Sequence, residues 1–210
     1  MTTVRGPQQA RSQATRARLI EAAAECLVQR GYAGTSTQAV AQGAGVSQGA
    51  LFKHFPSKAE LLGAAVAHLL ASLVGMFRRE AGRRLGRAKG GALGRVGPAV
   101  GALWAVFRSA EMSALLEVYV AGRTDPVLEA RLGPALEAHN GHILDEARRL
   151  FPEVASHPEF EGAVGAIVYA MQGVVVGLFG AAARDDAANL AFFERLARRE
   201  IGPLLAGEVS

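Results

Sequence analysis

Apolar side chains recur every three or four positions along most of this chain, which is the spacing of amphipathic helices. From Ser12 or Thr15 to Arg30, two neighbouring rows of apolar residues predict a first helix. Gly31 then suits the left-handed position just beyond a helix end. Strand-type alternation of Val, Ile, Thr and Tyr is scarce. The pattern therefore predicts an all-α protein.

A short helix is predicted over residues 38–44, with an apolar side made of valine and alanine. Gly43 weakens this helix by about 1 kcal/mol relative to alanine, so packing has to hold it. Gly45 ends it. Three neighbouring hydroxyl residues are candidates for its N-cap, namely Thr35, Ser36 and Thr37.

Two further helices follow at once. Ser47 is placed to cap a helix over residues 48–55, which Pro56 ends because the residue before proline avoids the helical region. The stretch "SKAE", residues 57–60, has the spacing of a capping box. A wide apolar stripe predicts that the helix opened there continues to about residue 85.

The Gly-rich basic stretch "GRAKGGALGRVGP", residues 86–98, predicts a loop. Asp125-Pro126 is a helix-start signal, and Gly133-Pro134 predicts a kink or a break. Beyond the loop, the apolar spacing predicts helices over residues 99–108, 111–121, 126–150, 159–182 and 187–201.

Residues 163–180 are apolar apart from Gln172 and just reach the length of a membrane span. Their flanks carry acidic residues and no interfacial belt of aromatic residues. We therefore interpret this helix as buried between its own domain and a partner subunit, and we expect no membrane association.

Charge is distributed unevenly along the chain. Residues 1–58 and residues 59–97 each hold seven Lys and Arg against two Glu, whereas residues 98–210 hold nine Arg against fifteen acids. The basic N-terminal part predicts contact with a polyanion. The single cysteine, Cys26, and the lack of a secretory leader predict a cytoplasmic protein.

Two short helices joined through Gly45 form a helix-turn-helix, whose second helix enters the major groove of DNA with its N-terminal residues first. Gln48 can form paired hydrogen bonds with adenine, and Ala50 offers a methyl contact for thymine. The predicted base-reading residues are Ser47, Gln48, Gly49 and Ala50.

The other side chains of this region divide between core and rim. Leu51 and Phe55 are four residues apart and face back onto the first helix. Hydroxyl, amide and basic groups at the rim suit DNA phosphates, which set register rather than sequence. The predicted phosphate-contacting residues are Thr35, Ser36, Thr37, Gln38, Phe52, Lys53, His54 and Lys58.

Over residues 15–66 the chain resembles the tetracycline-repressor (TetR) family of bacterial transcription regulators. The resemblance rests on motifs at fixed spacings, among them Gly31-Tyr32, Ala44-Gly45-Val46-Ser47 and His54-Phe55. Members of this family commonly have tyrosine at position 52, with its hydroxyl on a phosphate. Phe52 lacks that hydroxyl, so a contact between Phe52 and DNA stays open.

The resemblance implies a homodimer on a pseudo-palindromic operator, with a C-terminal pocket for a small-molecule effector. Residues 1–11 are polar with Gly-Pro and predict a flexible basic arm. We expect a helix-turn-helix domain over residues 12–58, an effector-binding and dimerisation domain over residues 59–205, and a tail over residues 206–210. The usual dimer-forming pair of the family corresponds to the helices near 159–182 and 187–201.

Several large or polarizable side chains of the C-terminal helices could line an apolar effector pocket, although each could equally be ordinary core. His139 and His142 are three residues apart without a well-placed third ligand, so we predict no metal site. No catalytic motif or cofactor motif occurs, so we expect neither an enzyme nor a cofactor. The candidate pocket residues are Phe77, Trp104, Phe107, Met112, Tyr119, His139 and Met171.

The sequence therefore favours a ligand-responsive repressor that a small, largely apolar molecule releases from double-stranded operator DNA. An effector-independent DNA binder or an activator of the same fold remains an alternative. A helical small-molecule or lipid-binding module at an acidic membrane surface is an alternative of another class. The capped helix-turn-helix, with Gln48 at its reading end, argues against the last.

Overall fold

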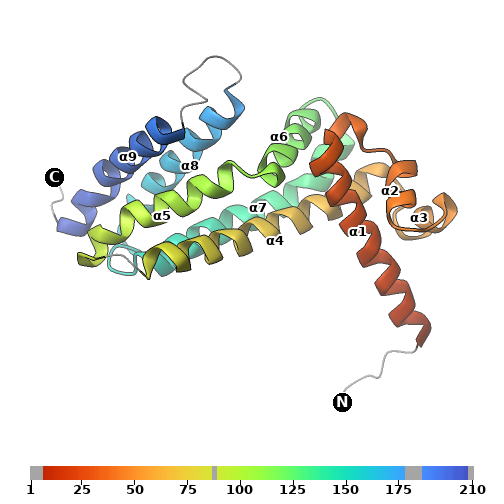
Figure 1. Cartoon of the computed structure of the whole chain (residues 1–210), viewed down its shortest axis with the longest axis horizontal. Helices are drawn as coiled ribbons and strands as arrows, with labels where there is room; N and C mark the ends of the chain where they lie inside the picture. Colours follow the sequence, from red (N-terminus) through yellow and green to blue (C-terminus); the bar gives the residue numbers. More distant parts are fainter. Residues whose placement is uncertain (1–6, 87–88, 178–185, 208–210) are drawn as a thin grey trace. The chain divides into compact units, whose positions relative to one another are not determined.

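The computed structural model of this protein describes residues 7–86, 89–177 and 186–207 (Figure 1). These residues form nine helices and no strand, which confirms the predicted all-α class. By compactness the chain divides into two units. The first unit comprises residues 1–71 and 114–137, and the second comprises residues 72–113 and 138–210.

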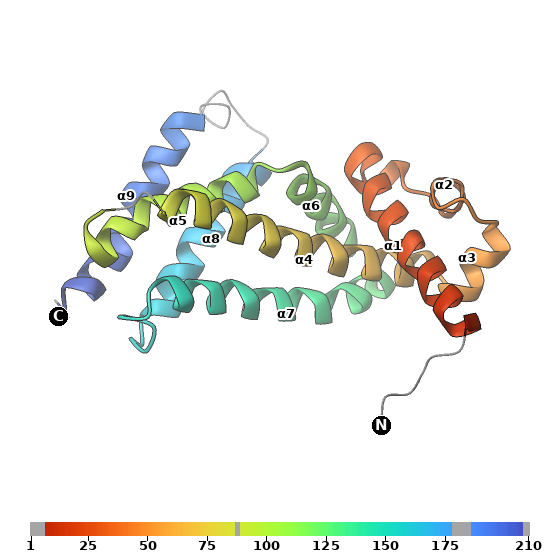
Figure 2. The same cartoon turned by 60° about the horizontal axis from the view of Figure 1, so that its bottom comes forward.

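The first unit begins with α1 (Pro7–Gly34), α2 (Thr37–Gly43) and α3 (Gln48–His54), which Figure 2 shows from a second side. It continues into α4 (Lys58–Leu85) and adds the later part of α6 (Ala110–Gly122) and the earlier part of α7 (Pro126–Leu150). Helices α1, α2 and α3 enclose a core of fully buried side chains. Its largest members are Leu19, Leu27, Val40, Leu51, Phe55, Leu61 and Leu62.

Helix α1 is longer than its apolar pattern indicates. It begins at Pro7, so residues 7–11 are helical and do not belong to the irregular arm that we predicted. Proline suits the first turn of a helix, and the Gln, Ala and Arg residues after it have good helix propensity. Residues 1–6 of the predicted arm lie outside the described residues.

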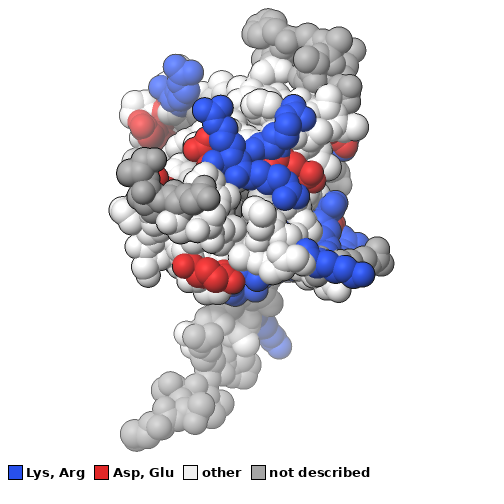
Figure 3. All heavy atoms as spheres, turned by 90° about the vertical axis from the view of Figure 1, so that its left-hand side faces the viewer, with Lys and Arg blue, Asp and Glu red and all other residues white. Residues whose placement is uncertain are grey.

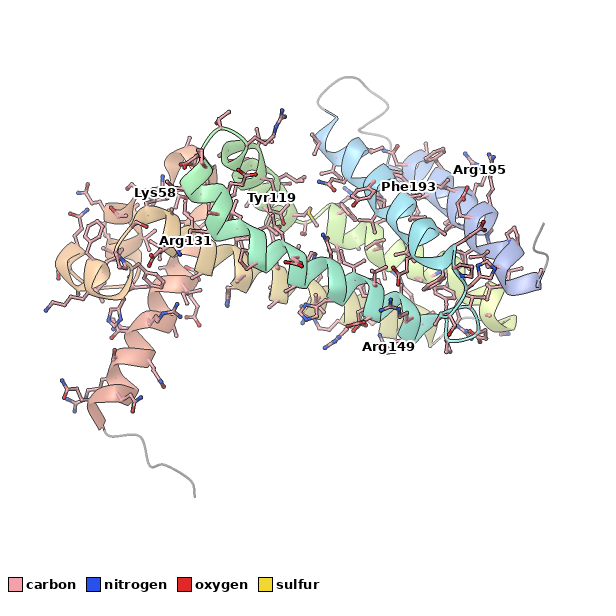
Figure 4. The ribbon with its side chains drawn as sticks, turned by 180° about the vertical axis from the view of Figure 1, so that it is seen from behind. Lys58, Tyr119, Arg131, Arg149, Phe193 and Arg195 are labelled. Carbon is pink, nitrogen blue, oxygen red and sulfur yellow. The ribbon has the colours of Figure 1, made fainter. Side chains whose placement is uncertain are left out.

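In the second unit, α5 (Gly91–Phe107), α8 (Phe160–Val176) and α9 (Asp186–Ala206) pack against one another. Phe193 of α9 is completely buried, and its ring centroid lies 5.0 Å from that of Trp104 in α5 (Figure 4). The indole N–H of Trp104 donates a hydrogen bond of 2.6 Å to Asp186. This aromatic pair joins α5 to α9.

The predicted loop over residues 86–98 is wrong for most of its length, because α5 begins at Gly91 and contains Pro98. Glycine and proline disfavour an isolated helix, but packing against α9 and α8 outweighs their low propensity. Val96, Ala99 and Val100 are buried by this packing. Helix propensity judged from the local sequence alone therefore predicts the wrong structure for this segment.

The remaining C-terminal helices agree with the predicted ones within a few residues. Helix α7 continues through Pro134 without a break. Helix α8 ends at Val176, and residues 178–182 of the helix that we predicted lie outside the described residues. By length and composition α4 could cross a membrane, but a core helix passes the same test, and its Leu and Val side chains line the core.

A buried carboxylate joins α4 to α7 inside the second unit. The Glu146 side chain is only 8% exposed, and its oxygens lie 2.7 Å from guanidinium nitrogens of both Arg78 and Arg149. Burial acts to raise the pKa of Glu146, but the hydrogen bonds from the two arginines outweigh it and lower the pKa below 4.5. Figure 3 shows basic and acidic side chains lying close together on one face of the molecule.

We predict that Glu146→Gln lowers the free energy of unfolding by about 1–3 kcal/mol at pH 7, because the three charge-assisted hydrogen bonds from Arg78 and Arg149 weaken. Urea unfolding measures this loss. The folded-state pKa of Glu146 is depressed, so its contribution is complete above about pH 4.5 and is lost as the pH falls through that lower pKa. The difference in the free energy of unfolding between wild type and variant should therefore become smaller at acidic pH. Glu129→Gln, at an exposed position, is the matched control and should have no effect.

Candidate nucleic-acid interface

Two serine caps fix the ends of the helix-turn-helix. The Ser36 side-chain oxygen accepts a hydrogen bond of 3.1 Å from the Ala39 amide at the start of α2. The Ser47 oxygen accepts one of 3.2 Å from the Ala50 amide at the start of α3. Between the helices Gly45 has φ of 64°, in the left-handed region that favours glycine. The turn and both helix starts therefore lie where the sequence predicts them.

The two faces of α3 differ in burial. Leu51 is completely buried and Phe55 is 2% exposed, so this side of the helix faces the core. Ser47, Gln48 and Gly49 are exposed at its N-terminal end. The side-chain amide of Gln48 forms no hydrogen bond with any described residue. Its N–H donors and its carbonyl acceptor are therefore free for a base edge.

The predicted phosphate-contacting residues are distributed around this exposed end of α3. Lys53 and Phe52 are exposed, the latter at 45%, and His54 is half-buried. At the start of α2, the side chains of Ser36 and Gln38 are exposed and Thr37 is half-buried. A serine hydroxyl that accepts a capping hydrogen bond can still donate its proton to a phosphate. Ala50 is half-buried, so a thymine methyl can still reach part of it.

Thr35 is the exception among the predicted phosphate contacts. It is 1% exposed, and its hydroxyl donates a hydrogen bond of 2.7 Å to the Gly31 carbonyl. A buried hydroxyl with an internal partner cannot bind DNA, so the prediction for Thr35 is wrong. Its backbone amide also bonds to the Tyr32 carbonyl, at 3.2 Å. Thr35 therefore closes the turn between α1 and α2.

Lys58 begins α4 beside an aromatic ring and near an ion pair. Its ammonium nitrogen lies 4.9 Å from the centroid of the Tyr32 ring, within the range of a cation–π interaction. Glu60, in the same turn, forms a 3.0 Å ion pair with Arg131 of α7 (Figure 4). The Glu60 amide donates to the Ser57 hydroxyl at 3.2 Å, which confirms the capping interaction there. The half-buried Lys58 is thus held in place beside the helix-turn-helix.

Comparison with known proteins identifies the family to which this chain belongs. The sequence model for bacterial regulatory proteins of the tetR family matches residues 19–65. The HTH-type transcriptional regulator Rv2912c of Mycobacterium tuberculosis is 31% identical over 156 residues, which cover 72% of this chain and 75% of that protein. The chain belongs to the TetR family. It is a DNA-binding transcriptional regulator, and its relatives are regulators rather than enzymes.

Solved structures agree with the fold of this TetR-family regulator. A TetR-family transcriptional regulator from Mesorhizobium loti superposes with a TM-score of 0.69 at 19% identity, covering 91% of this chain and 97% of that one. The multidrug binding protein EbrR, complexed with imidazole, gives a TM-score of 0.58 at 19% identity, covering 86% and 93%.

A carboxylate of α6 binds the backbone at the kink near the end of α1, where Gly31 interrupts the helical conformation. The Tyr32 amide donates a hydrogen bond of 2.8 Å to Glu117, a partner 85 residues away that the sequence did not indicate. Gly31, directly before it, has φ of 68° and lies so close that a Cβ there would overlap the Glu117 carboxylate. Glycine is therefore required at this position both by its backbone conformation and by space.

Six of the candidate pocket residues belong to the second unit, whereas Tyr119, whose pKa burial raises, belongs to the first. The ring of Trp104 packs against that of Phe193, and its N–H donates a hydrogen bond to Asp186. Both contacts are typical of a core residue. Burial and the nearby His142 lower the pKa of His139, and within the described ranges its buried Nδ1 has no hydrogen-bond partner. The other four are buried or half-buried, namely Phe77, Phe107, Met112 and Met171. Among the described residues, no three His, Cys, Asp or Glu side chains are placed to share a metal ion.

We predict that replacing each of three glycines by alanine changes the free energy of unfolding by a different amount. Gly31→Ala should cost about 2 kcal/mol or more, because it adds both backbone strain and overlap with Glu117. Gly45→Ala should cost about 1–2 kcal/mol, since its φ is also positive but nothing lies within 4 Å of the new Cβ. Gly82→Ala, in α4 with open space, should be neutral or slightly stabilising. Thermal and urea unfolding measure the order, and equal losses at Gly31 and Gly45 would contradict the role of Glu117.

Proposed function

We propose that this protein is a ligand-responsive repressor that binds a pseudo-palindromic operator as a homodimer. The observation that carries the proposal is the exposure of Ser47, Gln48 and Gly49 at the N-terminal end of α3, while Leu51 and Phe55 anchor the same helix in the core. A recognition helix needs this division, because base edges can be read only by side chains that project from the body. The base-reading role of Ser47, Gln48, Gly49 and Ala50 is part of this proposal.

Phosphate contacts complete the proposed interface. We assign them to Ser36, Thr37, Gln38, Lys53, His54 and Lys58, with Phe52 able to offer only its ring. Such contacts fix the register of the protein on the duplex and make binding depend steeply on salt. Location in the cytoplasm follows from this role, and the relatives are bacterial transcriptional regulators.

The homodimer is proposed through α8 and α9, each of which has an exposed apolar side. Tyr169 of α8 is 70% exposed, and Val176, two turns further along the helix, is 42% exposed. Phe192 of α9 is 47% exposed. Large apolar side chains of this kind, on two helices that pack together, are typical of a subunit interface. Two copies would present two recognition helices to successive major grooves, about 34–36 Å apart.

Release by a small, largely apolar molecule is the last part of the proposal. The structural neighbour EbrR is a multidrug binding protein complexed with imidazole. Within the second unit, the buried Nδ1 of His139 has no hydrogen-bond partner among the described residues and offers one polar anchor, and its lowered pKa keeps the imidazole neutral at pH 7. A panel of apolar compounds tested for operator release would check this. If none of these compounds releases the DNA, the result favours the alternative of an effector-independent DNA binder.

We predict that Gln48→Ala reduces sequence discrimination while Lys53→Ala reduces affinity for every sequence. Loss of a bidentate amide contact should cost about 1–3 kcal/mol of discrimination at one base pair, or about 5–150-fold. Duplexes selected by wild type from a randomised library, followed by mobility-shift titrations with single-base changes, measure both effects. Binding by wild type without any sequence preference would overturn the proposed function.

We predict that Tyr169→Arg turns the dimer into a monomer and lowers operator affinity, because a charge enters the apolar interface. Val127→Arg is the matched control, since Val127 of α7 is 63% exposed and lies outside α8 and α9. Sedimentation measures the oligomeric state of both variants. A Tyr169→Arg protein that stays dimeric would show that another surface joins the subunits.

A further inference from the structure

The outer segment of α1, residues 8–18, forms a helix that contributes nothing to the core. Every residue in it is exposed except Thr15, which is half-buried, and the first buried side chain of α1 is Leu19. Figures 1 and 2 both show this part of α1 extending past α2 and α3. Since so short a helix is marginal in water by itself, it forms here as a continuation of the packed part of α1.

The charge of the outer segment has one sign. It carries Arg11, Arg16 and Arg18, and the first acidic residue of the chain is Glu21. Within the described part of the chain, neither Arg11 nor Arg18 is in an ion pair. These two arginines are seven residues apart and therefore lie on the same side of the helix, about 10 Å from each other. An exposed helix of this kind has charge complementarity to a polyanion.

Arg16 connects the outer segment to the reading helix. Its guanidinium carbon lies 4.9 Å from the centroid of the Phe55 ring, and Phe55 is the C-cap of α3. Lys53 and His54 lie in the last turn of α3, directly before Phe55. The basic surface of α1 therefore begins beside the proposed phosphate-contacting end of α3. From Arg16 the eight preceding residues of the segment reach about 12 Å further, roughly a third of a turn of DNA.

We infer that the outer segment of α1 is a second DNA-contacting element, in which Arg11 and Arg18 bind backbone phosphates of the duplex that flanks the half-site read by α3. The inference rests on the proposed function. Such contacts raise affinity for any flanking sequence without adding base readout. A membrane surface is a poorer partner, because the stretch "QQARSQATRAR" has no large apolar residue with which to enter lipid.

The salt dependence of binding tests the inference. The probe is a duplex that the full-length wild type selects from a randomised library, with ten base pairs added on each side. For Arg11→Ala/Arg18→Ala, the slope of log affinity against log salt should fall by about 1.8 per bound subunit, since each lost phosphate contact removes about 0.9. Arg11→Lys/Arg18→Lys should keep the wild-type slope. The control Arg79→Ala/Arg123→Ala removes the same charge from other exposed positions and should also keep it.

Trimming the added flanks provides a second readout that does not depend on folding differences. Wild type should lose affinity when the flanks are removed, and Arg11→Ala/Arg18→Ala should not, because it no longer contacts them. If wild type selects a sequence but the double variant has the slope and flank dependence of the control, the inference is wrong and the proposed function stands. Loss of binding to anionic vesicles, with unchanged DNA slope, would assign the segment to membranes instead. If wild type selects no sequence at all, the proposed function itself fails.

Discussion

The DNA-binding surface depends on the burial of Leu51 and Phe55 in the core of the first unit. Both side chains come from one side of a helix of only two turns, so together they fix its rotation about its own axis. That rotation leaves Gln48 and Lys53 on the outside. A helix this short has little stability of its own, so the hydrophobic contact both forms α3 and orients the exposed end that we propose to read bases.

The turn between α1 and α2 provides the second constraint. Gly31 adopts a backbone conformation that other residues rarely reach, Thr35 returns its hydroxyl to the Gly31 carbonyl, and Glu117 accepts the amide of the residue between them. Two local groups and one carboxylate 85 residues away thus satisfy backbone polar groups that the turn leaves outside the helical hydrogen-bond pattern. The direction in which α2 leaves α1, and with it the position of α3, follows from this network.

In the second unit, packing between helices outweighs the local preference of the sequence. Its α5 contains glycines and a proline that favour a loop, and it is helical because α8 and α9 cover its apolar side. Polar groups buried elsewhere in this unit also find partners: Trp104 of α5 bonds to Asp186 of α9, and Glu146 of α7 pairs with two arginines. His139 Nδ1 lacks a partner among the described residues, and for that reason it is the one group of this unit that we connect with a ligand.

The sequence by itself determined the short helices, their serine caps and the glycine turn, because each depends on residues within four positions of one another. It also determined which side of α3 carries Gln48, since apolar spacing alone gives the faces of a helix. Only the tertiary structure decided that Thr35 is buried, that Glu117 binds the backbone at the kink near the end of α1, and that residues 91–98 are helical. Those outcomes depend on contacts between residues far apart in the chain, whose energies outweigh local preference and leave no pattern in the neighbouring sequence.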